Sequence, residues 1–265
     1  MKNINAYVIS NIGNVRENHE DNFYIPEDKF INESVQKEIR SSDTNVEYEY
    51  KGNTGVFAVC DGMGGHCAGE VASKIAVENI ASEQNKLVDG NKEQLLNFIK
   101  ELNDKICDYG ETHVNCNNMG STFSAVIVSS NGINTLHVGD SRIYKYVDDK
   151  LEQISIDHTE GVRLVAAGIL KKENLDKFPN RKSLYKYLGR KGELVADCEK
   201  VEGFTKGKII IASDGLSDTL GSDEIISVLR QNSESKEICH KLIEECLKKG
   251  EKCTDNVTIV VMDIY

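Results

Sequence analysis

Short apolar segments that end in an acidic residue recur along the chain. Residues 56–60 form an unbroken apolar run with β-branched and aromatic side chains, which predicts a strand buried on both faces. Asp61 follows directly, and glycines at 62, 64 and 65 allow the backbone to bend sharply and to approach a ligand closely. Two more predicted strands precede acids in the same way, 136–138 before Asp140 and 208–213 before Asp214. An isolated buried carboxylate is costly unless it is paired or bound to a cation, so this pattern suggests a divalent cation.

Apolar residues three and four apart predict several helices. Two of them cover 67–82 and 92–109, and near the C-terminus Ser222 is expected to cap another. The helix after that carries Cys239 and Cys246 seven residues apart, hence on one face. We expect these two thiols to pack in the core rather than to bind a metal.

Strands and turns account for most of the remaining pattern. Asn131-Gly132 predicts a hairpin turn. The two strands of this hairpin are predicted at 121–129 and 134–138, and those of a second hairpin at 141–147 and 151–154. Further strands are predicted at 5–15, 194–201 and 256–264. Because the four hairpin strands have turn-length connections, they predict one antiparallel meander.

Three segments fit this pattern less well. Residues 26–53 are polar and are expected to lie outside the core, with one or two short helical turns. Residues 157–169 predict a helix with Val162, Val165 and Ala166 toward the core. Residues 170–192 are irregular and basic, and indicate either a surface for a phosphorylated or acidic partner or a solvated mobile flap.

Composition excludes several classes of protein. The chain has 265 residues and a formal net charge of −11, which disfavours a nucleic-acid partner but not a phosphorylated one. The first five residues lack the apolar core of a signal peptide, and no run approaches the roughly 18 apolar residues of a membrane span. None of the 8 cysteines forms a C-x-x-C pair, so we expect reduced, buried thiols. We therefore expect a soluble cytoplasmic monomer without a membrane partner, folded as a single domain over residues 1–265.

The charged cluster at 16–21 has two interpretations. It is either a solvated turn between strands, or a site in which Arg16 binds an anion while Glu20 and Asp21 face a cation. Together with Asp255, which precedes the last predicted strand, it adds to the acids at strand ends. Ligation by oxygen alone selects hard cations such as Mg²⁺ or Mn²⁺ over zinc.

Seven short motifs occur in an order that resembles the bacterial form of the type 2C, or PPM, metal-dependent serine/threonine protein phosphatases. They are R-x-x-x-E-D (16–21), D-G-M-G-G-H (61–66), G-S-T (120–122), V-G-D-S-R (138–142), D-H-T (157–159), A-S-D-G-L-S-D (212–218) and T-D-N-V-T (254–258). The resemblance spans nearly the whole chain. It implies an α+β fold, a four-layer αββα sandwich of two antiparallel β-sheets with helices packed on both outer faces, and a flap-like segment at 157–192.

The resemblance also implies roles for the acids. Two divalent cations, Mg²⁺ or Mn²⁺, are expected between the sheets, bridged by Asp61. Glu20 and the Gly62 carbonyl complete one site, and Asp214 and Asp255 the other. Asp21 orients a water, Arg16 grips the substrate phosphate, and Asp140, Asp214 and Asp218 resemble a weaker third metal site.

The implied reaction is hydrolysis of phosphorylated serine and threonine in proteins, among them a Ser/Thr kinase and its substrates. A water activated by the two metals attacks phosphorus in line, with no covalent enzyme intermediate. The chain departs from some relatives at Met63, where they carry a histidine proposed as general acid, and His66 is expected to be structural. Two alternatives remain, a catalytically silent scaffold that binds phosphoproteins and a hydrolase of small phosphate esters.

Overall fold

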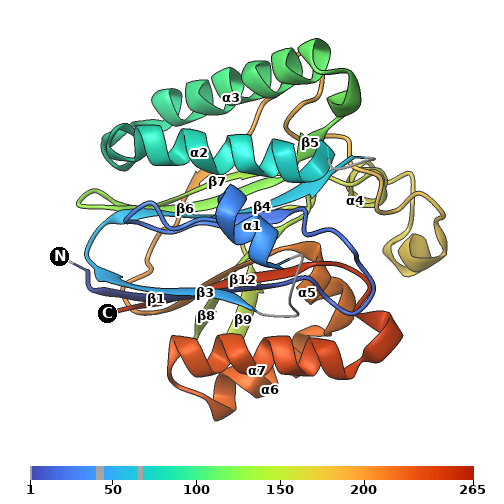
Figure 1. Cartoon of the computed structure of the whole chain (residues 1–265). Coiled ribbons are helices and arrows are strands. Elements are labelled where there is room, and N and C mark those ends of the chain that lie inside the picture. The colour runs from blue at the N-terminus through green and yellow to red at the C-terminus, as the bar shows by residue number, and fades with distance from the viewer. Residues whose placement is uncertain (1, 40–44, 65–67) are drawn as a thin grey trace.

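Two antiparallel six-stranded sheets stack face to face in the computed structural model of the chain, which describes residues 2–39, 45–64 and 68–265 (Figure 1). One sheet has the order β3 (Val46–Gly52), β1 (Ile4–Asn11), β12 (Val257–Ile264), β11 (Gly207–Ala212), β8 (Arg142–Val147) and β9 (Lys150–Gln153). The other has the order β10 (Asp197–Lys200), β7 (Gly132–Val138), β6 (Phe123–Ser129), β4 (Gly55–Met63) and β2 (Asp21–Tyr24), with β5 (Gly120–Ser121) paired to β4.

Helices cover the outer face of each sheet, which confirms the predicted four-layer sandwich (Figure 1). The pair α2 (Ala68–Asp89) and α3 (Lys92–Thr112) packs on the sheet that contains β4. The sheet that contains β12 is covered by α5 (Asp214–Thr219), α6 (Ser222–Gln231) and α7 (Ser235–Lys248). The short elements are α1 (Glu33–Ile39), α4 (Glu160–Ala166) and three 3₁₀ turns, η1 (Val114–Cys116), η2 (Lys172–Lys177) and η3 (Gly250–Lys252).

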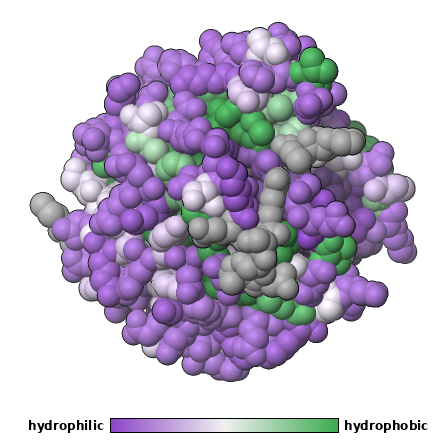
Figure 2. Space-filling model, in the orientation of Figure 1, coloured by the Kyte–Doolittle hydropathy of each residue, from purple (hydrophilic) through white to green (hydrophobic). Residues whose placement is uncertain are grey.

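Strand β4 shows why its sequence is apolar without interruption. Val56, Ala58 and Cys60 pack toward α2 and α3, whereas Phe57 and Val59 pack between the two sheets. Side chains alternate across a strand, so a strand in the middle of four layers needs apolar residues on both faces. In contrast, the outer surface is mainly hydrophilic in the view of Figure 2, with small apolar patches.

Several details of the predicted order were wrong. The two hairpins do not form one meander, because β6–β7 belongs to one sheet and β8–β9 to the other. The segment 26–53 is not simply outside the core, since β3 pairs with β1 and Ile31 and Ile39 are buried. Within α4 only Gly161 is buried, so the helix does not present an apolar face to the core.

The C-terminal elements largely follow the prediction. Helix α6 starts at Ser222 with Gly221 as its cap, so Ser222 is not the capping residue. Cys239 and Cys246 of α7 are both buried, as expected for core packing. No helix in the described ranges is long and apolar enough to cross a membrane.

Candidate metal centre

Acidic residues from both sheets meet at one end of the sandwich. In one sheet, Asp21 at the start of β2 lies directly opposite Asp61 of β4 in the strand register. In the other sheet, Asp214 follows β11 and Asp255 precedes β12, and these antiparallel neighbours place both acids at the same end.

A hydroxyl network joins the two sheets at Asp21. Its Oδ2 accepts hydrogen bonds from Ser213 Oγ and Thr258 Oγ1, both at 2.7 Å. Thr258 Oγ1 also lies 2.6 Å from Ser10 Oγ, which contacts the buried His19 at 3.0 Å. Asp21 is thus held between the sheets by residues that the sequence analysis did not single out.

The pKa values of the acids show how closely they are grouped. Burial, and then the neighbouring Asp255 and Asp214, raise the pKa of Asp21 to about 7. Burial and the charge of Asp21 and other acids raise the pKa of Asp61 well above its ordinary value. Burial raises the pKa of Asp214 to about 6 and that of Asp140 to about 8, with further contributions from nearby carboxylates. The raised pKa values show that several acidic side chains lie close together at this end of the sandwich.

The donor set fits hard divalent cations. Asp214 Oδ1 is buried without a hydrogen-bond partner in the described part of the chain, as expected of an atom that serves a ligand. Within the same residues, no group of three or more His, Cys, Asp or Glu side chains has by itself the geometry to hold an ion. Mg²⁺ usually keeps several waters, and both Mg²⁺ and Ca²⁺ sites are built from oxygens, so protein side chains need not complete the shell.

The backbone around Asp61 is fixed by the G-S-T motif. Asp61 N donates to Thr122 Oγ1 at 2.9 Å, and Thr122 N donates to the Asp61 carbonyl at 2.8 Å. Ser121 Oγ donates to the same carbonyl at 3.1 Å. The motif thus holds the strand end that carries the central carboxylate.

Gly62 sits where only a glycine fits. Its N–H donates to the Glu20 carbonyl at 3.2 Å. A Cβ at this position would lie 2.2 Å from the Gly69 carbonyl oxygen and 2.5 Å from that of Glu20. The close approach brings Glu20, Gly62 and the start of α2 together beside the acids.

The loop that carries Arg16 and Glu20 is clamped by Asn256. Its Nδ2 donates to the carbonyls of Ile12 at 2.9 Å and Asn18 at 3.1 Å, and its Oδ1 accepts from Glu20 N at 2.7 Å. Arg16 Nη2 in turn lies 2.7 Å from Asp255 Oδ2. The loop is therefore a structured part of the site, which favours the second interpretation of its charged cluster.

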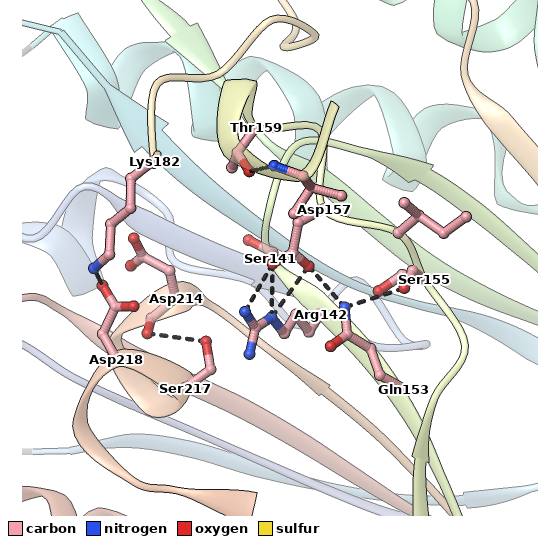
Figure 3. A network of polar contacts seen from close by, with 12 residues as sticks. Ser141, Arg142, Gln153, Ser155, Asp157, Thr159, Lys182, Asp214, Ser217 and Asp218 are labelled. Atoms are coloured by element: carbon pink, nitrogen blue, oxygen red, sulfur yellow. Dashed lines mark hydrogen bonds and ion pairs between the residues drawn. The ribbon is translucent and has the colours of Figure 1, made fainter. Parts of the chain in front are cut away.

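A pocket of about 290 Å³ opens on the flap side of the acids (Figure 3). Asp140, Asp214 and Asp218 line it, which brings the three residues of the predicted third site together. Lys182 reaches from the flap to form an ion pair with Asp218. A larger groove of about 690 Å³ lies between α2 and α3, but none of the predicted site residues lines it.

Arg142 and Asp157 form the floor of this pocket. Arg142 Nε and Nη2 contact the Asp157 carboxylate at 3.0 and 2.7 Å, and Gln153 Nε2 donates to Asp157 Oδ1 at 2.7 Å (Figure 3). Both charged residues belong to quoted motifs, V-G-D-S-R and D-H-T. Their pairing, however, needed the structure.

The structure thus brings the predicted residues together in three adjoining groups. The first is Arg16 with Glu20 and Asp255, and the second is Asp21 with Asp61 and Asp214. The third is Asp140 with Asp214 and Asp218. His66 lies outside the described residues. The residues that sequence reasoning missed are Ser213, Thr258, Asn256 and Asp157. The first three adjoin predicted ligands inside A-S-D and T-D-N-V-T, and this adjacency was the available signal.

Comparison with known proteins agrees with this arrangement. The model of the protein phosphatase 2C family matches residues 35–248. Serine/threonine phosphatase Stp of Listeria welshimeri is 29% identical over 228 residues, 84% of this chain and 90% of that protein. Serine/threonine protein phosphatase PstP of Mycobacterium tuberculosis is 33% identical over 210 residues, 79% of this chain and 40% of that protein.

A solved structure extends the similarity. The catalytic domain of the serine/threonine protein phosphatase PstP in complex with two manganese ions superposes with a TM-score of 0.75 at 29% identity, covering 99% of each chain. The chain therefore belongs to the protein phosphatase 2C, or PPM, family of bacterial serine/threonine phosphatases.

Proposed function

We propose that this chain hydrolyses phosphorylated serine and threonine residues of proteins with the help of two divalent cations and without a covalent enzyme intermediate. The observation that carries the proposal is the grouping of Asp21, Asp61 and Asp214 from both sheets, whose pKa values are raised by burial and by neighbouring carboxylates. The manganese ions of the PstP structure support it.

The residues divide between two cation positions. Glu20, the Gly62 carbonyl and Asp61 would hold one cation, and Asp61, Asp214 and Asp255 would hold the other. Asp140, Asp214 and Asp218 would hold a third, weaker cation on the pocket side. A pair of such cations supplies the Lewis acidity that makes water a nucleophile near neutral pH.

Asp21 and Arg16 have complementary tasks. Both hydroxyl groups that donate to Asp21 use its Oδ2, so we assign Oδ1 to the orientation of the attacking water. Arg16 has a side chain 47% exposed and lies beside Asp255. Its planar guanidinium can bind two phosphate oxygens at once and stabilise their charge as the ester bond breaks.

The cysteines have no part in this chemistry. Burial raises the pKa of the Cys60, Cys198, Cys239 and Cys253 thiols, which keeps them protonated at neutral pH. A thiol nucleophile needs the opposite shift. The proposal also takes residues 1–265 as one catalytic domain with a flap at 157–192, and a Ser/Thr kinase and its substrates as its partners.

Hydrolysis of a phosphothreonine peptide tests the proposal. With Mn²⁺ we expect turnover that a chelator abolishes and that alkylation with N-ethylmaleimide leaves unchanged. The Asp214→Asn variant should lose at least about 100-fold in kcat, because a cation ligand is removed, and should stay folded by circular dichroism. Turnover in excess chelator would contradict the proposal.

The same assay separates the alternatives. A scaffold would bind the peptide without hydrolysing it at any Mn²⁺ concentration. A hydrolase of small esters would turn over p-nitrophenyl phosphate with a higher kcat/KM than any phosphopeptide. The proposed enzyme should prefer the peptide.

A further inference from the structure

The outer part of the flap is strongly basic in an acidic protein. Residues 170–192 contain eight lysine and arginine residues and two acidic residues, whereas the whole chain has a net charge of −11. The remainder of the protein is therefore even more acidic than its net charge suggests. A basic segment in an otherwise acidic protein indicates that its positive charge has a local role.

Some of these cations fasten the flap to the body of the protein. Lys182 pairs with Asp218, Lys186 Nζ lies 3.0 Å from Asp197 Oδ1, and Lys191 Nζ lies 2.8 Å from Glu111. The backbone adds bridges from Thr159 to Leu184 and from Ser121 to Leu188. These contacts set the position of the flap relative to the metal centre.

A second set of flap cations adjoins the pocket of the metal centre and forms no ion pair within the described residues, and we call it the free basic set: Lys172, Lys177 and Arg181. Arg190 lines a separate pocket beside α3 and is not part of this set. Lys172 and Lys177 are exposed, and Arg181 is half-buried. Helix α7 shows the contrast, because its Lys241 and Lys248 each contact two glutamates. Glu173 and Asp176 also belong to η2, yet neither forms an ion pair with Lys172 or Lys177 in the described part of the chain. These two exposed ammonium groups therefore remain available to an anionic ligand.

The free basic set lies beside the pocket of the metal centre. Leu175 and Asp176 line that pocket and belong to the same turn, η2, as Lys172 and Lys177. Arg181 lines it directly. A peptide with its phosphorylated residue at the metal centre would therefore run close to these cations.

We propose, resting on the phosphatase function above, that the free basic set binds acidic side chains of the substrate within a few residues of the phosphorylated serine or threonine. The flap then selects substrates by charge. Exposed ion pairs are individually weak, and a few of them together change association more than chemistry. The selection should therefore appear in KM and should weaken with salt.

Three phosphothreonine peptides of equal length test this, with Glu, Ala or Lys at the flanking positions, on the Mn²⁺-loaded full chain. We expect kcat/KM to fall about fivefold from Glu to Ala and further to Lys, through KM, and the differences to shrink in 0.5 M NaCl. The double variant Lys172→Glu/Lys177→Glu should abolish or reverse the order. Its hydrolysis of p-nitrophenyl phosphate, which has no flanking residues, should be unchanged.

The control is the double variant Lys150→Glu/Lys206→Glu. Both residues are exposed, and neither has an ion pair in the described part of the chain. Lys150 is the first residue of β9, and Lys206 comes directly before β11. Both lie at the end of the sheet away from Asp214, which follows the other end of β11. The control changes the net charge equally but should keep the preference for Glu. Equal loss of preference in both variants, or equal kcat/KM for the three wild-type peptides, would overturn the inference.

Failure of the proposed phosphatase function can be distinguished from failure of the inference about the flap. It would appear as no Mn²⁺-dependent turnover of any substrate. Fluorescence anisotropy with the Asp214→Asn variant then still tests the flap, because peptide binding needs no turnover. Tighter binding of the Glu peptide that Lys172→Glu/Lys177→Glu removes supports the inference, and equal binding of all three peptides refutes it.

Discussion

Asp21 and Asp61 lie directly opposite each other across the β2–β4 pair, and the charge of Asp21 is one of the causes that raise the pKa of Asp61. A buried carboxylate directly opposite a half-buried one is unfavourable for a sheet. On the proposed function, a bound cation would offset the repulsion between the two, and the effect on stability can be measured.

The chelated protein should lose stability as pH rises. Burial raises the pKa of Asp140 to about 8 in the folded protein, against an ordinary value of 3.8. Between these values the native state keeps a proton that the unfolded chain has released, so its stability falls with rising pH. Asp140→Asn should therefore stabilise the chelated protein at pH 8 by on the order of 2 kcal/mol and have little effect near pH 4.

Thermal melts in chelator from pH 4 to 8 measure this difference. Mn²⁺ at 100 times its Kd should raise the stability of the wild type by about 2.7 kcal/mol. A wild type that is more stable than Asp140→Asn at pH 8 without metal would contradict the assignment.

Replacement of Arg16 should impair substrate binding and leave the fold intact. Charge-assisted hydrogen bonds contribute about 1.5–3 kcal/mol, so Arg16→Ala should lower kcat/KM by roughly 10- to 100-fold. Arg16→Lys keeps the charge but not the two-pronged geometry, and should recover only part of the loss. Steady-state kinetics check both variants, and full recovery by lysine would show that Arg16 acts as a simple charge.

Gly62→Ala should destabilise the protein and weaken Mn²⁺ binding together. The added methyl meets two backbone carbonyls at 2.2 and 2.5 Å, neither of which can rotate away. We expect a loss of about 2–3 kcal/mol. Gly221→Ala is the matched control, since its nearest atom, Glu224 Oε2, lies at 3.7 Å and its φ is −72°. Urea unfolding and calorimetric Mn²⁺ titration measure the two effects, and equal stability of both variants would refute the close approach.

Arg142→Met should cost about 3 kcal/mol of unfolding free energy. It leaves the Asp157 carboxylate, whose side chain is 10% exposed, without its bidentate partner. Lys145→Met on the same strand removes a more exposed pair with Glu152 and should change stability by less than about 1 kcal/mol. Denaturant unfolding distinguishes the two, and similar values would mean that the Arg142 pair is solvated.

The sequence predicted the parts of the fold that depend on local patterns. The unbroken apolar run of β4 was interpreted correctly because a strand between two apolar layers has no polar face. The prediction of one antiparallel meander was wrong because a short connection, such as that between β7 and β8, shows only that two strands are near each other. It does not show that the two strands pair. Strand β3 was missed although Glu47, Glu49 and Lys51 alternate with Val46 and Tyr48, which is the period of two of a half-buried strand. The segment 26–53 was judged by its polar composition as a whole, and this short alternation was overlooked.

In the candidate site, too, local sequence patterns predicted some residues, whereas contacts between distant residues could not be predicted. Asp61, Asp140 and Asp214 could be found because each comes after an apolar run in the sequence. The contacts of Arg16 with Asp255 and of Glu20 with Asn256 join residues more than 230 positions apart. Such pairs leave no periodic trace in one sequence.

The clamp made by Asn256 has a consequence for biosynthesis. Residues 12–20 are translated more than 230 residues before their partner, Asn256. A nascent chain can form the α2–α3 layer long before it can close the site. The loop that carries Arg16 and Glu20 therefore takes its final position only after the segment with Asn256 has been synthesised.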